Sequence, residues 1–150
     1  MNIMNHTQTP DLVRRFQQCR LAVGDFSHRN HIFVARWYLL NYGLAAGAER
    51  YAGDIKRLAE AVGHGKKFHA TITHALLQLI GERLSSGDGE DWQVFEINNR
   101  DLFEDAKALR LARYSAKTLD CEAARRGIVE PDYPLLEGVQ AKNCNSANRV

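Results

Sequence analysis

Histidine is the residue type whose spacing in this chain most suggests chemistry. His28 and His31 are three residues apart, so they share one face of a helix that we predict over residues 27–43. His69 opens a second helix, predicted over residues 68–84. The positive end of a helix disfavours a protonated imidazole, so rings in these first turns should be neutral, as a metal ligand or general base must be. Where two such helices are neighbours, the three imidazoles converge at one end of a bundle.

Two kinds of chemistry fit these rings, and the residue types leave both open. His28, His31 and His69 could form a three-histidine face for a divalent transition metal, iron or zinc, with Glu130 or Asp132 as an oxygen ligand. Alternatively, His31 and His69 act as general acid and base while Glu130 orients an imidazole. The spacing matches neither the zinc-protease helix nor the di-iron bundle. Each ring could also be a solvated or hydrogen-bonded structural residue.

Three polar residues near the histidines are candidates for substrate binding. Tyr38 continues the face of His31 along its helix, although core packing is the default interpretation of this aromatic residue. Thr73 lies one turn beyond His69 on the same side. Lys67 belongs to the short basic turn that precedes His69. These positions would bring a phenol, a hydroxyl and an ammonium group to the same end of the bundle.

Polar groups in the last third of the chain could complete a site. Arg113 and Tyr114 supply a fixed cation and a phenol at a helix junction, which suits an anionic substrate and equally suits helix capping. Glu130 follows the apolar pair at 128–129, so we expect it to be drawn against the core. Asp132 is interpreted as a surface charge.

Four short segments, at residues 26–31, 67–73, 113–115 and 129–132, resemble in their order the motifs of one family. They resemble a family of small, uncharacterised bacterial all-helical proteins that reads His-Arg-x-His, Lys-Tyr-His-x-Thr and Glu-Pro-Asp. The likeness covers about residues 10–136, and Phe68 departs from the usual tyrosine. The resemblance implies no reaction. It implies that the following residues should be considered together: His28, His31, Lys67, His69, Thr71, Thr73, Tyr114 and Glu130.

The elements that must position these residues are helices. Apolar periodicity and capping residues predict helices over residues 10–22, 27–43, 44–62, 68–84, 92–97, 101–112 and 116–126. Pro131 and Pro134 bias their predecessors away from helix, so residues 128–134 should be extended. No strand pattern stands out. We therefore expect an all-α, single-domain antiparallel helical bundle with a short C-terminal extended segment and tail.

Length and composition indicate one cytoplasmic domain. A chain of 150 residues can bury one core, which we place in residues 10–136, between a flexible N-terminus at 1–9 and a disordered tail at 137–150. The net charge of +2 and the absence of a dense Lys/Arg run give no reason to expect nucleic acid. No apolar run approaches the roughly 20 residues that span a bilayer. Three widely spaced cysteines are not a disulfide framework, so we expect reduced thiols.

These patterns predict a small enzyme that acts on a small organic substrate in a pocket between helices. Isomerisation, cyclisation, lyase chemistry and metal-dependent oxidation all fit, and a role in specialised metabolism is conceivable for a protein of this size. The alternative is a non-catalytic module that binds a small ligand or a metal, or a helical protein-interaction domain. A homodimer through the Ala-rich third helix, at residues 44–62, is the expected form of protein contact.

Overall fold

The computed structural model describes residues 9–85 and 91–133, and this part of the chain is all-α, with no strand. In chain order, the elements are α1 (Asp11–Gln17), η1 (Val23–Asp25), α2 (His28–Tyr42), α3 (Leu44–Ala61), η2 (Gly65–Lys67), α4 (Ala70–Ser85), α5 (Trp92–Asn98), α6 (Arg100–Glu104), α7 (Ala106–Leu111), α8 (Ala116–Asp120) and α9 (Glu122–Arg126). The prediction of a single-domain helical bundle is confirmed. None of these helices is both long and apolar enough to cross a lipid bilayer.

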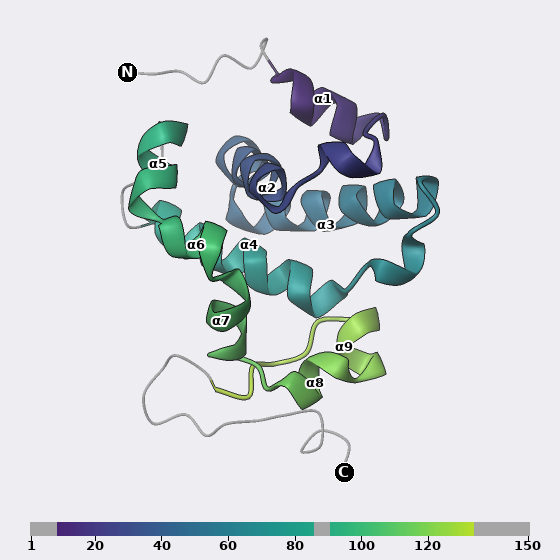
Figure 1. The fold of residues 1–150 in the computed structure, drawn as a ribbon, viewed down its shortest axis with the longest axis vertical. Helices are drawn as coiled ribbons and strands as arrows, with labels where there is room; N and C mark the ends of the chain where they lie inside the picture. Colours follow the sequence, from purple (N-terminus) through teal and green to yellow (C-terminus); the bar gives the residue numbers. More distant parts are fainter. Residues whose placement is uncertain (1–8, 86–90, 134–150) are drawn as a thin grey trace.

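Figure 1 shows that α3 and α4 form the middle of the molecule and run in opposite directions, one above the other. Helix α2 is seen nearly end-on and packs against α3, so the two cross instead of lying side by side. Helix α1 lies over α2 and α3, the short helices α5 to α7 descend along one side, and α8 and α9 lie beneath α4. The flexible N-terminus predicted at 1–9, except for residue 9, and the disordered tail predicted at 137–150 lie outside the described residues, as do the last three residues of the predicted domain.

Local signals in the sequence explain where the long helices begin and end. The Ser27 hydroxyl accepts a hydrogen bond from the backbone N–H of Asn30 at 3.2 Å, which caps α2. Gly43 follows α2 with φ of 90°, and Gly63 follows α3 with φ of 83°, both in the region that favours glycine. Ser115 caps α8 in the same way as Ser27 caps α2.

Three predicted helices are shorter than expected. Helix α1 ends at Gln17 instead of residue 22, because the backbone turns at Cys19, which has φ of 56°. The segments predicted as single helices at 101–112 and 116–126 are each two short helices. Asp105 separates α6 from α7, and Cys121, in an extended conformation, separates α8 from α9. Cys19 is a free thiol, whereas Cys121 is disulfide-bonded, contrary to the expected reduced state.

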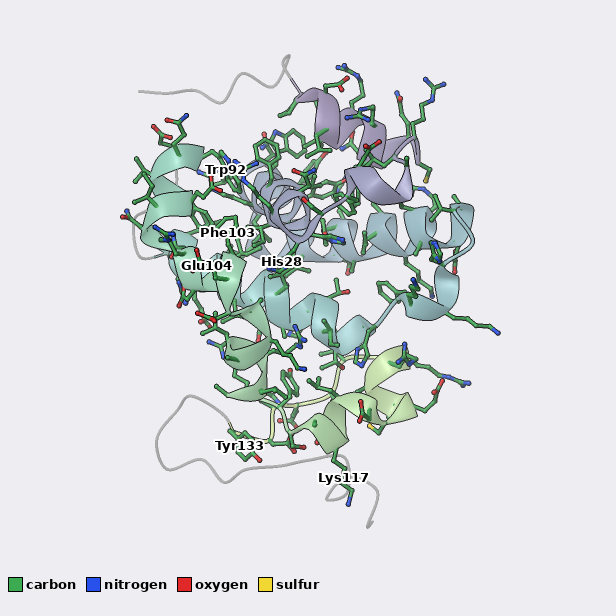
Figure 2. The ribbon with its side chains drawn as sticks, viewed as in Figure 1. His28, Trp92, Phe103, Glu104, Lys117 and Tyr133 are labelled. Carbon is green, nitrogen blue, oxygen red and sulfur yellow. The ribbon has the colours of Figure 1, made fainter. Side chains whose placement is uncertain are left out.

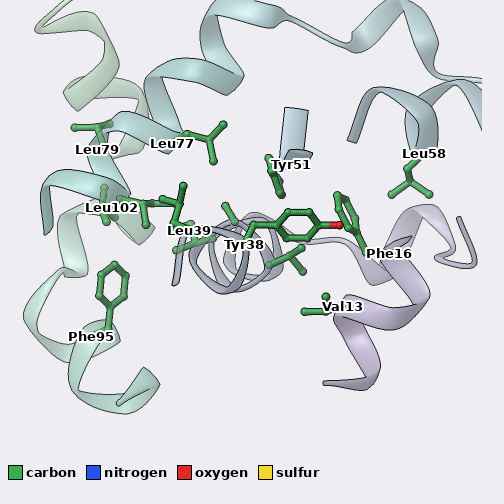
Figure 3. Close-up of a cluster of buried hydrophobic side chains, with 14 of the residues drawn as sticks. Val13, Phe16, Tyr38, Leu39, Tyr51, Leu58, Leu77, Leu79, Phe95 and Leu102 are labelled. Carbon is green, nitrogen blue, oxygen red and sulfur yellow. The ribbon is translucent and has the colours of Figure 1, made fainter. Parts of the chain in front are cut away.

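The main core is built from α1 to α6 and centres on stacked aromatic rings (Figure 3). Phe16 of α1 stacks on Tyr51 of α3 with ring centroids 5.4 Å apart, and Tyr38 of α2 meets both rings edge-on. The backbones of α2 and α3 touch at Gly47, where an added Cβ would lie 2.5 Å from the Tyr38 carbonyl oxygen. This close approach fixes the crossing of α2 and α3 and so sets the position of residues on both.

The C-terminal segment at 127–133, within the stretch predicted to be extended, contains no helix and is held against α4 and the start of α8 by hydrogen bonds. The Thr71 hydroxyl donates to the Gly127 carbonyl at 2.8 Å and accepts from the Val129 N–H at 3.2 Å. Farther along, the Tyr133 N–H donates to the Arg113 carbonyl at 2.9 Å. These bonds hold α8 and α9 against the first half of α4.

Candidate active site

A pocket of about 450 Å³ opens between the N-terminal end of α2, the second half of α3 and the first half of α4. The loop around η1, the turn at η2 and helix α7 complete its wall. Most of the lining is aliphatic or aromatic, which is typical of a small-molecule site. The polar lining consists of four histidines and four other side chains, which are His28, His31, His64, His69, Tyr51, Lys67, Thr73 and Arg110. The predicted convergence of histidines from α2 and from the start of α4 is therefore present.

His31 is a partly buried histidine that lies against the aromatic wall of this pocket. Its ring lies against Phe26 with centroids 3.9 Å apart, and its Nδ1 is 3.0 Å from the Tyr51 hydroxyl. Burial is the main reason that the pKa of His31 falls to about 4, and the nearby His28 contributes to the same shift. His31 is therefore neutral at physiological pH. No hydrogen bond from the described residues reaches its Nε2.

The bond to Tyr51 selects one tautomer of His31. Tyr51 is buried, and within the described chain its hydroxyl has His31 as its hydrogen-bond partner. If Nδ1 were the donor, the Tyr51 proton would be left buried without an acceptor, which costs about 1–3 kcal/mol. The Tyr51 O–H therefore donates to Nδ1, and the ring proton is on Nε2. His31 thus offers an N–H donor to a molecule in the pocket.

His28 is the first residue of α2, and its side chain reaches α6 (Figure 2). Its Nε2 is 2.8 Å from the Leu102 carbonyl oxygen, which can only accept, so Nε2 carries a proton. In the neutral ring the lone pair is then on Nδ1. His28 and His31 together combine a potential proton acceptor with a neutral donor on one helix face.

His69 has a structural hydrogen bond at each ring nitrogen. Its Nε2 donates to the Leu119 carbonyl at 2.7 Å, and its Nδ1 accepts from the Ile72 N–H at 3.1 Å. The ring therefore caps the first turn of α4 and joins it to α8. The predicted role of His69 as acid, base or metal ligand finds no support, because neither nitrogen is available in this arrangement.

The three-histidine metal face at His28, His31 and His69 is not formed. Among the residues that the structure describes, no group of three or more His, Cys, Asp or Glu side chains is arranged to hold a metal ion. The reason is that each ring is turned toward a different hydrogen-bond partner, on α6, α3 and α8 respectively. Iron or zinc at these residues is a prediction that the geometry does not favour.

The other predicted site residues divide into two groups. Lys67 and Thr73 line the pocket together with the histidines. Tyr38 instead donates a hydrogen bond to Asp54 and belongs to the core, where its ring packs against that of Tyr51. The remaining three, Arg113, Tyr114 and Glu130, lie outside the pocket wall.

Arg113 and Tyr114 hold the fold together instead of facing a substrate. Arg113 forms an ion pair with Glu82 of α4, with nitrogen and oxygen 2.6 Å apart. The buried Tyr114 donates its hydroxyl hydrogen to the Val129 carbonyl at 3.2 Å. Both contacts attach the α7–α8 junction to neighbouring segments.

Glu130 and Asp132 exchange the roles predicted for them. Glu130 is exposed, whereas Asp132 is only 2% exposed. The Asp132 carboxylate accepts from the Ser115 N–H at 2.6 Å and from the Thr118 hydroxyl at 2.8 Å. The expectation that Glu130 would be drawn against the core was wrong, because the hydrogen-bond donors at the start of α8 are met by the carboxylate of Asp132.

Sequence reasoning missed Tyr51, His64 and Arg110 as pocket residues. Tyr51 and Arg110 lie in amphipathic helices whose pattern does not distinguish a pocket wall from a core or a surface. His64 belongs to the basic turn that carries Lys67, and it is partly exposed and contributes to the lining. Its place next to the glycines of the turn before Lys67 was the available signal.

A larger groove of about 820 Å³ lies between α3 and α4 on another side of the molecule. Its wall is mainly alanine and leucine, and its titratable residues are His74, Glu49 and Glu82. Burial lowers the pKa of His74. Because the groove lacks a convergent set of polar groups, the smaller pocket is the better candidate for chemistry.

No family model, curated protein or solved structure matches this chain. The resemblance to a bacterial helical family therefore stays a prediction, and the site is argued from geometry.

Proposed function

We propose that this protein is a small enzyme that binds a small organic molecule in the pocket and transfers a proton at the His28–His31 face. The observation that carries the proposal is the neutral, oriented His31 ring in a mainly apolar cavity. A neutral imidazole that donates from Nε2 can polarise a carbonyl oxygen without first losing a proton. His28, with its lone pair on Nδ1, supplies the proton acceptor.

Isomerase or lyase chemistry is the reaction class that these two groups support. In such a reaction His28 removes a proton from the carbon next to a carbonyl group, and the electrons of that C–H bond move onto the carbonyl oxygen. The His31 N–H stabilises the negative charge that develops there. Return of the proton to a different carbon gives an isomer, and loss of a neighbouring leaving group gives a lyase product.

Exchange of carbon-bound hydrogen tests this proposal without knowledge of the product. A panel of apolar ketones, aldehydes and 2-oxo acids is incubated with the protein in D₂O, and deuterium incorporation next to the carbonyl is followed by NMR. We expect exchange with at least one compound, and we expect it to fall by about a hundredfold or more in His31→Phe and His28→Gln.

Two tryptophan variants of α3 provide a matched comparison. Ala59 lines the pocket and Ala61 is exposed, so Ala59→Trp should fill the cavity while Ala61→Trp leaves it open. Exchange that survives in Ala59→Trp, or in both histidine variants, contradicts the proposal. Ligand binding without any exchange would instead support the alternative, a non-catalytic binding module.

A cytoplasmic location in a bacterial cell, with a small molecule as the partner and neither nucleic acid nor membrane bound, completes the proposal. Fractionation of the producing cells tests the location.

A further inference from the structure

The polar groups that line the pocket include two cations and no carboxylate. Lys67 and Arg110 are the cations, and none of the described lining residues is Asp or Glu. His31 adds an uncharged N–H donor, as argued above, and Thr73 adds a hydroxyl. The pocket is therefore suited to bind a molecule that carries hydrogen-bond acceptors, and an anion in particular.

Arg110 is the unusual member of this set. Its Nε is buried without a hydrogen-bond partner, and no ion pair to a described residue compensates the guanidinium. Burial lowers the pKa of Arg110, and no carboxylate contributes in the opposite direction. By contrast, the next arginine along the chain, Arg113, is paired with Glu82, and Arg83 of α4 is paired with Asp101.

Because the Arg110 side chain is partly buried and its Nε is unpartnered, a counter-charge in the pocket would stabilise it. Taking a charge out of water without a partner is costly, and the cost is recovered when an anion binds. The planar guanidinium presents parallel N–H groups that match the two oxygens of a carboxylate. The remaining wall, which includes Ile55, Leu58 and Leu76, is apolar and suits a hydrocarbon or aromatic body.

We propose that the ligand of this pocket is an organic carboxylate with an apolar body, and that the Arg110 guanidinium receives the carboxylate while Lys67 adds a second positive charge at the mouth. This inference deepens the proposed function, on which it rests. It narrows the substrate class from small organic molecules to monocarboxylates, such as 2-oxo acids with an apolar side chain.

Four compounds that share one hydrocarbon chain but differ in the charge of their head group test the inference by direct binding. Octanoate, octanamide, octylammonium and octyl phosphate are titrated into the full-length protein by calorimetry. We expect octanoate to bind at least about tenfold more tightly than octanamide, which corresponds to about 1.4 kcal/mol. Octylammonium should bind more weakly than octanamide.

Variants on α7 identify the residue responsible. Arg110→Gln should remove the preference for octanoate over octanamide but keep octanamide binding, and Arg110→Lys should keep only part of the preference. Lys107 is exposed on the same helix and does not line the pocket, so Lys107→Gln is the matched control and should behave like the natural protein. Circular dichroism checks that each variant is folded.

The possible failures are distinguishable. Equal binding of octanoate and octanamide, or a preference that persists in Arg110→Gln, overturns the carboxylate inference and leaves the pocket proposal intact. Tighter binding of octyl phosphate than of octanoate overturns the choice of carboxylate. If no member of the series binds, or if Ala59→Trp binds all of them as the natural protein does, both the carboxylate inference and the proposed function are wrong.

Discussion

The Tyr51 hydroxyl oxygen lies 3.0 Å from His31 Nδ1, and this contact links the first turn of α2 to the middle of α3. Because the bond places the ring proton of His31 on Nε2, long-range proton–nitrogen NMR at neutral pH should show a single Nε2–H tautomer. In Tyr51→Phe the acceptor at Nδ1 loses its donor, so we expect a mixture of tautomers and a loss of about 1 kcal/mol of stability. A wild-type spectrum dominated by the Nδ1–H tautomer would contradict the assignment.

The low pKa of His31 predicts a loss of stability in mild acid. In the unfolded chain the pKa is near its ordinary value of 6.5, whereas in the folded protein it is about 4. Between these values the unfolded state binds more protons, so stability falls as pH falls from about 6.5 to about 4 and is fully present above that window. The effect should reach about 3 kcal/mol.

Urea denaturation at neutral pH and near pH 5 measures this effect. In His31→Phe the pH dependence should be smaller than in the natural protein. His74, whose pKa burial also lowers, is unchanged in both proteins, so their difference isolates His31. Equal pH dependence in the two proteins would show that His31 is not a buried neutral ring.

His69 should contribute to the stability of the folded protein and not to catalysis. His69→Ala removes the cap of α4 and the bond to the Leu119 carbonyl, so we expect a loss of about 2–4 kcal/mol. His69→Asn can restore the cap alone and should recover part of this loss. The His64 side chain makes no hydrogen bond to the described residues, so His64→Ala should change the free energy of unfolding by less than about 0.5 kcal/mol.

The exchanged roles of Glu130 and Asp132 give a direct comparison of two neighbouring carboxylates. Asp132→Ala leaves the Ser115 N–H and the Thr118 hydroxyl without their acceptor, so it should lower the free energy of unfolding by about 2–3 kcal/mol. Glu130→Ala changes an exposed side chain and should have a much smaller effect. Thermal melts of the two variants decide the matter, and a larger effect at Glu130 would reverse our assignment.

Two glycines of α3 should respond oppositely to alanine. At Gly47 the new Cβ would collide with the Tyr38 carbonyl, so Gly47→Ala should destabilise the protein by several kcal/mol or prevent folding. At Gly53 nothing lies within 4 Å of the new Cβ. Gly53→Ala should therefore raise stability by about 0.5–1 kcal/mol, through the better helix propensity of alanine.

Local signals were sufficient to predict the long helices, because caps and glycines act within a few residues. Helix α2 begins after Ser27 and ends before Gly43, as expected, and Gly63 follows α3. The break at Cys19 could not be predicted in this way, since cysteine rarely adopts a positive φ, and the break at Cys121 has no glycine or proline to mark it. Tertiary packing decides both breaks.

The site was predictable only in part for a related reason. The spacing of His28 and His31 shows that they share a face, but hydrogen bonds to carbonyls far along the chain decide which nitrogen each ring exposes. The His28 ring is bound by Leu102, and the His69 ring by Leu119. Arg110 carries no local signature at all, because its lack of a counter-charge is a property of the assembled pocket.

The contact at Gly47 also determines how a molecule could enter. Since the backbones of α2 and α3 meet there without an intervening side chain, these two helices form a stiff pair that does not separate to admit a guest. A ligand in the pocket would then meet an α2–α3 wall of fixed width, so any adjustment to its size would fall on other parts of the wall, such as the turn at residues 63–67 that carries Lys67.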